Sequence, residues 1–218
     1  YILQTQSPQV NDRGQDYIQG ARAGDVWLRN APVQIVAGDE GILFQPVMFQ
    51  KDFVEWIPRT RGGGYVGRHP TRPDDAVNRP DPNNPNRQNW MRPNGNEVRE
   101  TRYHIGFAVI PDGRTFPYVI PMSGSGHTVS RQWMSVMNAA QLNGKGVATW
   151  AKRYRLKTRE RSNQAGTWFT WDISDAGWVQ TPEEYQRGSE LYKAFESGAR
   201  AAAAPEHEVQ DGGEDRAI

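Results

Sequence analysis

Five basic side chains alternate along one stretch of the chain, RYRLKTRERSNQAGTWFTWDI, residues 153–173. They occupy every second position: Arg153, Arg155, Lys157, Arg159 and Arg161. Successive side chains of a β-strand point to opposite faces, so a strand here would present all five on one face, whereas a helix would scatter them. A row of cations is suited to the phosphates of a nucleic acid. The spacing therefore predicts a cationic strand that binds nucleic acid.

The register of a hairpin decides which side chains accompany these cations. SNQAG predicts a connection, and TWFTWDI predicts a returning strand rich in aromatic and β-branched residues. A four-residue loop, 163–166, pairs Ser162 with Thr167, and a slip of one residue would exchange the two faces. This register places Trp168 and Thr170 on the charged face. It leaves an apolar face beneath, made of Tyr154, Leu156, Phe169, Trp171 and Ile173.

A flat aromatic ring beside cations is typical of sites that bind single-stranded DNA, because every base has a face on which a ring can stack. We therefore expect Trp168 to stack on a base. The alternative is a solvated edge hairpin that has no ligand.

A second group of cations surrounds three glycines, in FVEWIPRTRGGGYVGRH, residues 53–69. Arg59, Arg61 and Arg68 flank the glycines at 62–64, and Tyr65 follows them. Glycine lets a backbone approach a ligand closely, so these residues are further candidates for DNA contact. Equally, the segment fits a flexible hairpin tip that needs positive φ angles.

Residues suited to catalysis or metal binding are sparse. The histidines are scattered without metal-ligand spacing, at His69, His104, His127 and His207. MSGSGHT, residues 122–128, lacks the lysine of a P-loop. We expect a glycine-rich turn capped by Thr128, or a contact to a DNA phosphate, with Arg131 projecting from the helix that follows. We expect no enzyme activity, no cofactor and no metal.

Strands are predicted at 33–37, 42–57, 97–110 and 115–121, with a bulge or an edge at Pro46. A helix is predicted at 128–142, ended by Asn143 and Gly144. Another begins at Thr181, with proline at its first position and a glutamate at its third. Antiparallel strands, with one helix inside their order and one after it, predict a mainly β protein with two helices. The expected architecture is an OB-like antiparallel β-barrel.

We divide the chain into an N-terminal arm (1–31), an OB-like β-barrel domain (32–180), a C-terminal helix (181–205) and an acidic tail (206–218). Within the barrel domain, 69–96 holds six prolines and many polar residues. Such a segment cannot bury enough apolar surface to offset its ordering entropy, so we predict a long mobile loop.

Charge is distributed unevenly along the 218 residues. The net charge is +1, but residues 206–218 hold five acids and one arginine, and residues 1–205 hold 25 cations and 20 acids. We expect the acidic tail to compete with DNA phosphates for the basic body. The absence of cysteine fits a reducing cytoplasm. No apolar run approaches membrane-spanning length, so we expect no membrane partner.

The segments SPQV, FVEWIPRTRGGGYVG, RQWMS and YRLKTRERSNQAGTWFTWDI resemble a group of phage proteins. The basic, aromatic-lined β-body with its acidic tail is similar to bacteriophage single-stranded-DNA-binding proteins. That resemblance implies an OB-like fold, cooperative coating of single strands, and a tail that contacts replication or recombination proteins. The tail of those proteins commonly ends in an aromatic residue, whereas this chain ends in Arg216, Ala217 and Ile218.

Two functions follow from these patterns. The first is a single-stranded DNA-binding protein of phage replication or recombination. The second is a virion or assembly protein whose basic strand packs against acidic subunits.

Overall fold

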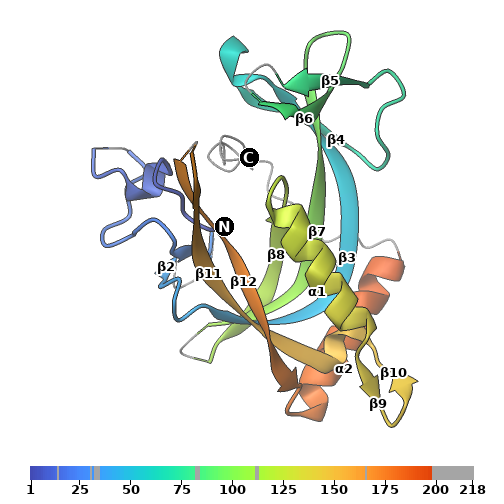
Figure 1. Ribbon diagram of the computed structural model, residues 1–218. Coiled ribbons are helices and arrows are strands. Elements are labelled where there is room, and N and C mark those ends of the chain that lie inside the picture. The colour runs from blue at the N-terminus through green and yellow to red at the C-terminus, as the bar shows by residue number, and fades with distance from the viewer. Residues whose placement is uncertain are drawn as a thin grey trace.

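Two long strands form the centre of the computed structural model, which describes residues 1–13, 15–29, 31, 35–81, 84–110, 113–164 and 166–197. Strand β3 (Ile42–Ile57) pairs antiparallel with β7 (Glu97–Val109) over almost its whole length. Together they make a strongly curved ribbon to which other strands attach at either end (Figure 1).

At the body end of the ribbon, one strand borders each side. β8 (Thr115–Met122) pairs with β7. β11 (Lys152–Asn163) pairs with β3 only through Tyr154–Leu156 and continues beyond it as a hairpin with β12 (Gly166–Trp178). The hairpin therefore extends past the end of β3 (Figure 1).

At the distal end, β4 (Gly64–His69) pairs with β3, and β6 (Asn84–Met91) pairs with the first residues of β7. β5 (Val77–Asp81) completes this region by pairing with β6. We call β4, β5, β6 and their connections the distal extension; it stands apart from the two helices (Figure 1).

The two helices pack on opposite faces of the ribbon. On α1 (Gly126–Asn138), Trp133 contacts Phe44 and stacks on His104 at 4.3 Å. On α2 (Pro182–Glu196), Phe195 packs against the cluster that contains Tyr103 and Ile105. The main core lies on the α1 side, where Tyr154, Leu156 and Trp171 of the hairpin also lie. The predicted architecture, mainly β with two helices and a curled, OB-like antiparallel half-barrel, is confirmed.

Strand β3 has the bounds that its pattern of β-branched and aromatic residues predicts. The predicted irregularity at Pro46 is a bulge, since the register with β7 shifts between Pro46 and Met48. Proline lacks the N–H that a regular ladder needs, so a bulge at this point accommodates it in a central strand.

The N-terminal arm belongs to the core. It contains a 3₁₀ turn, η1 (Pro8–Val10), and a short strand, β1 (Val26–Trp27), that pairs with β2 (Ile35–Val36). Ile2, Val26 and Leu28 are almost fully buried in the main cluster. The arm therefore packs beneath the hairpin rather than extending from the domain.

The prediction of a loop at 69–96 was wrong, because this segment contains β5 and β6. The physical reason is that the segment is held by polar and aromatic contacts rather than by apolar burial. The Arg72 guanidinium lies 3.8 Å from the centre of the Trp90 ring, and Trp90 pairs with Val98 of β7. Sequence patterns that count apolar residues do not register such contacts.

The first helix differs from its prediction at both ends. It begins at Gly126 with Ser125 as N-cap, so Thr128 lies inside it and is not the cap. It ends at Asn138, and Gln141–Leu142 (β9) pairs with Lys145–Gly146 (β10). Asn143 and Gly144 both have positive φ, 52° and 75°, which is the conformation of a two-residue hairpin turn. The Asn-Gly pair therefore closes a hairpin instead of ending a helix.

A 3₁₀ turn, η3 (Thr149–Ala151), leads into β11. The second helix starts as predicted: the Thr181 hydroxyl accepts a hydrogen bond from the Glu184 amide, and Pro182 is the first helical residue. Its predicted continuation to residue 205 and the acidic tail at 206–218 lie outside the described residues.

Candidate nucleic-acid interface

The β11–β12 hairpin has the predicted register. Ser162 lies opposite Thr167, and pairing continues one step further, to Asn163 and Gly166. Arg161 lies opposite Trp168. The odd positions of β11 therefore share one face with the even positions of β12, as the alternation of the sequence predicts.

Four of the five predicted cations line the outer face of this hairpin. Lys157, Arg159 and Arg161 are exposed, and Arg155 is half-buried. Because they stand at alternate positions on one strand, their side chains project in the same direction. We call these four residues, Arg155, Lys157, Arg159 and Arg161, the cation row.

Arg153 does not belong to the cation row. The register of β11 shifts between Lys152 and Tyr154, and the Arg153 side chain at this irregularity is 11% exposed. Its guanidinium lies 3.6 Å from a carboxylate oxygen of Glu184 on α2. The charge of Arg153 is therefore used to hold the hairpin base against the C-terminal helix.

One acid shares the outer face with the cation row. Asp172 lies opposite Lys157 on β12, and its carboxylate accepts a hydrogen bond of 3.0 Å from Arg159. Both partners of this ion pair are about half exposed, so solvent weakens their attraction. The hairpin thus keeps an excess of positive charge on this face.

The N-terminal arm contacts the hairpin at the edge of β12 and on the face opposite the cation row. The Gln4 side-chain amide donates to the Phe169 carbonyl at 3.0 Å and accepts from the Phe169 amide at 2.9 Å, as a neighbouring strand would. The Thr158 hydroxyl donates to the Gly24 carbonyl at 2.6 Å. These contacts, together with the burial of Leu156, fix the part of the hairpin that extends beyond β3.

Trp168 lies on the cationic face, as predicted, but it is half-buried rather than fully presented. Its indole Nε1 is enclosed and has no hydrogen-bond partner among the described residues. Thr170 beside it is buried. Part of the Trp168 ring therefore contributes to packing, and only the remainder is available to a ligand.

The cations of the distal extension have partners inside the protein. Arg61 donates to the Asn94 carbonyl at 2.9 Å and to the Asn96 side chain at 2.7 Å. Arg68 forms an ion pair with Asp52 and lies over the Tyr103 ring, 4.4 Å from its centre. These contacts account for both arginines structurally, and we do not include them in the interface.

Two further candidates lie in the same region. Tyr65 is 36% exposed and meets Trp56 edge to face. The side chain of Arg59 is not among those that the structure describes. The three glycines have positive φ, in agreement with a hairpin tip.

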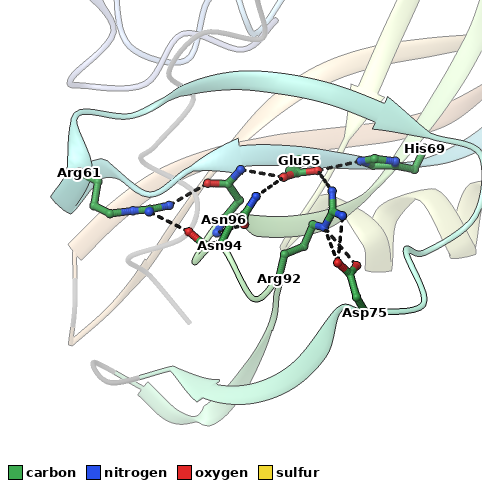
Figure 2. Close-up of polar contacts among 7 residues, drawn as sticks. All are labelled: Glu55, Arg61, His69, Asp75, Arg92, Asn94 and Asn96. Carbon is green, nitrogen blue, oxygen red and sulfur yellow. Dashed lines mark hydrogen bonds and ion pairs between the residues drawn. The ribbon is translucent and has the colours of Figure 1, made fainter.

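A buried carboxylate organises the distal extension. Glu55 of β3 is 2% exposed, and its two oxygens contact His69, Arg92 and Asn96 at 2.7–2.9 Å. Arg92 also forms an ion pair with Asp75 (Figure 2). Segments that are far apart in the sequence are therefore joined at one charged group.

The ionisation of Glu55 reflects this arrangement. Burial raises the pKa of the Glu55 carboxyl, but hydrogen bonds from Asn96, Arg92, His69 and Asn94 outweigh burial and lower its pKa to about 2. The pKa of Arg92 is raised, chiefly by its hydrogen bonds to Asp75 and then by those to Glu55. Both groups are charged at neutral pH, as a structural ion pair requires.

Arg131 is exposed on α1 and makes a 3.3 Å contact with the Thr128 hydroxyl. Arg131 does not belong to the cation row, because it lies on α1, the helix whose Trp133 packs against Tyr154 of the hairpin. In the glycine-rich turn, the Gly126 and His127 amides already donate to the carbonyls of Ser123 and Gly124. Those amides are therefore used by the turn itself rather than offered to a phosphate.

Other groups that could perform chemistry have structural partners. Buried His104 contacts the Ser130 hydroxyl at 2.9 Å, and burial lowers its pKa to about 3. A pocket of about 310 Å³ adjoins His104 and is lined largely by apolar side chains, among them Met48, Met137 and Phe195. The described residues contain no group of three or more side chains placed to bind a metal ion.

Sequence patterns missed several residues that shape these regions. Asp172 could have been found, because its even position places it on the cationic face. Glu55 also had a signal: it is a single acid within an apolar strand, FVEWI. Gln4 had none, since its partner Phe169 is 165 residues away.

The fold and the hairpin face together define a mainly β, half-barrel protein with an exposed cationic strand. A family model described as Pam3 phage gp34-like protein matches residues 1–201, and the chain belongs to this family. It is therefore a bacteriophage protein, as the resemblance implied. Comparison with curated proteins and with solved structures gave no match. None of the described helices is long and apolar enough to cross a membrane.

Proposed function

We propose that this phage protein binds single-stranded DNA without sequence preference, in replication or recombination in the host cytoplasm. The observation that carries the proposal is the cation row, in which four basic side chains on one strand face share that face with one acid of the described hairpin, Asp172. Phosphates of a nucleic acid are the ligand that such a row attracts, and their binding releases counterions.

Rigidity of the supporting hairpin favours this function. A cationic segment without fixed structure would lose backbone entropy on binding, whereas this row is mounted on a strand already held by β12, β3 and the N-terminal arm. Trp168, opposite Arg161, adds a partly accessible aromatic surface. By contrast, we assign Arg61 and Arg68 a structural role because their guanidinium groups already have partners inside the protein.

The tail at 206–218 extends the proposal through its net negative charge. It is suited to recruit basic surfaces of replication or recombination proteins once DNA occupies the cation row. The alternative function, a virion or assembly protein, would require an acidic protein surface to bind the same row.

Binding of a short fluorescent oligonucleotide, measured by anisotropy at several salt concentrations, tests the proposal. Arg155→Ala with Lys157→Ala should weaken binding and lower the log–log salt slope by about 0.7 for each lost phosphate contact. Lys145→Ala with Lys193→Ala removes two exposed cations elsewhere and should leave the slope unchanged. If the full-length protein binds no oligonucleotide at low salt, the proposal is wrong and the alternative is favoured.

A further inference from the structure

The spacing of the cation row limits the conformation of the strand that it can bind. Alternate side chains on one face of a β-strand stand roughly 6.6–6.8 Å apart. Four cations, from Arg155 to Arg161, therefore span roughly 20 Å along β11. The twist of the hairpin rotates this row gradually but does not shorten its steps.

A stacked nucleic acid strand does not match such a row. It advances only about 3.4 Å per nucleotide along its axis and winds around that axis, so its phosphates soon turn away from a nearly straight line of cations. A stretched strand advances about twice as far per nucleotide, because its sugar–phosphate backbone is nearly extended. Its successive phosphates then fall in step with successive cations.

We propose that the cation row binds an extended, unstacked single strand that runs along β11, with one phosphate at each of the four cations. This inference rests on the proposed function and adds the conformation and footprint of its ligand. The preferred ligands are single strands whose bases stack weakly, since less stacking is lost when they are extended.

The ends of the row are structurally defined, which sets its length. At the hairpin base, Arg153 turns toward Glu184 and leaves the face. At the tip, pairing ends at Asn163 and Gly166, just beyond Arg161. Between these limits, β11 is paired with β12 without a register shift, so the cations cannot move along the strand to follow a stacked helix.

Oligo-dT and oligo-dA of equal length test this inference on the full-length protein, because oligo-dA stacks and oligo-dT hardly does. We expect oligo-dT to bind roughly fivefold to tenfold more tightly. Ultraviolet absorbance of oligo-dA should rise on binding as its stack is broken. Energy transfer between dyes at the two ends of oligo-dT should fall as the strand is stretched.

A relocated charge provides the matched variant. Lys157 and Ser174 are exposed on the same face, on neighbouring strands, so Lys157→Ser with Ser174→Lys keeps the net charge and interrupts the row. We expect this variant to lose as much affinity as Lys157→Ser alone, with a salt slope lower by about 0.7.

The outcomes separate this inference from the proposed function. If both oligonucleotides bind but oligo-dA keeps its stacked absorbance and the dyes do not separate, the extended strand is excluded while DNA binding stands. Unchanged affinity in the relocated-charge variant would likewise show that only total charge matters. If neither oligonucleotide binds, the proposed function itself is wrong.

Discussion

The two ends of the β3–β7 ribbon are both rich in arginine, yet they use it in opposite ways. At the distal end, Arg61, Arg68 and Arg92 each have acidic or amide partners, and buried Glu55 is the partner of Arg92. At the body end, the cation row faces solvent, and among the described residues only Arg159 has an acidic partner on that face. The comparison teaches that a count of basic residues does not identify a binding surface. What distinguishes the two ends is whether the fold supplies each charge with a partner.

The largest expected effect is a loss of stability in the distal extension. Arg92→Ala leaves buried Glu55 without its cation, and losing one partner of a buried pair is strongly destabilising. We expect the free energy of unfolding to fall by about 3 kcal/mol, because Glu55 retains its amide donors. Urea unfolding measures this, with Arg79→Ala, an exposed arginine of β5, as the control. An equal loss in both variants would contradict the structural role of Arg92.

Low pH should also destabilise the distal extension. The pKa of Glu55 falls from an ordinary value of 4.5 to about 2 on folding, so the stability it contributes is complete above about pH 4.5 and is lost as the pH falls toward 2. The contribution is on the order of 3 kcal/mol. Unfolding free energies across this range should fall less steeply in Glu55→Gln, which has no charge to neutralise. Parallel pH profiles for the two proteins would show that Glu55 is not responsible.

Removing the tail should strengthen oligonucleotide binding by the cation row at the body end. We expect residues 206–218, which carry a net negative charge and are tethered to the body, to compete with DNA for the cation row. Deleting them should tighten oligonucleotide binding severalfold at low salt and less at high salt, since salt screens the competing charge. Titration of both lengths of the protein measures the effect, and equal affinities at low salt would rule out competition by the tail.

The smallest expected effect concerns the single acid on the outer face. Asp172→Asn frees Arg159 and should tighten oligonucleotide binding about twofold to fivefold, in keeping with the modest strength of exposed ion pairs. Asp175→Asn removes an equal charge that is paired with Lys152 and lies on the other face of β12. If both variants gain equally, the gain reflects overall charge rather than the release of Arg159.

Local patterns predicted those parts of the fold that depend on neighbouring residues. The bounds of β3, its bulge at Pro46 and the pairing of Ser162 with Thr167 followed from alternation and turn chemistry. The same alternation placed four of the five cations correctly. Arg153 could not be placed, because the irregularity beside it and its partner Glu184 depend on how α2 packs.

Contacts between distant residues account for what sequence patterns missed. The strands at 77–81 and 84–91 are stabilised by contacts of Arg72 with Trp90 and of Arg92 with Glu55. Such polar contacts produce no periodic pattern of apolar residues in the sequence. Asn143 and Gly144 fit either a helix end or a hairpin turn, and only the pairing of β9 with β10 decides between them. The burial of Trp168 depends on its surroundings in the folded chain, which periodicity does not describe.

The Gln4 side chain also affects whether neighbouring copies of the protein can pair through their strand edges. β12 is the outermost strand of its sheet, and an open strand edge can template association with another copy of the same chain. By engaging both backbone groups of Phe169, the Gln4 amide denies an incoming strand one of its pairing points. Many copies gathered on one long DNA molecule would bring such edges to high local concentration. If the proposed function holds, a single side chain near the start of the chain would thus help closely spaced copies to remain separate folded units.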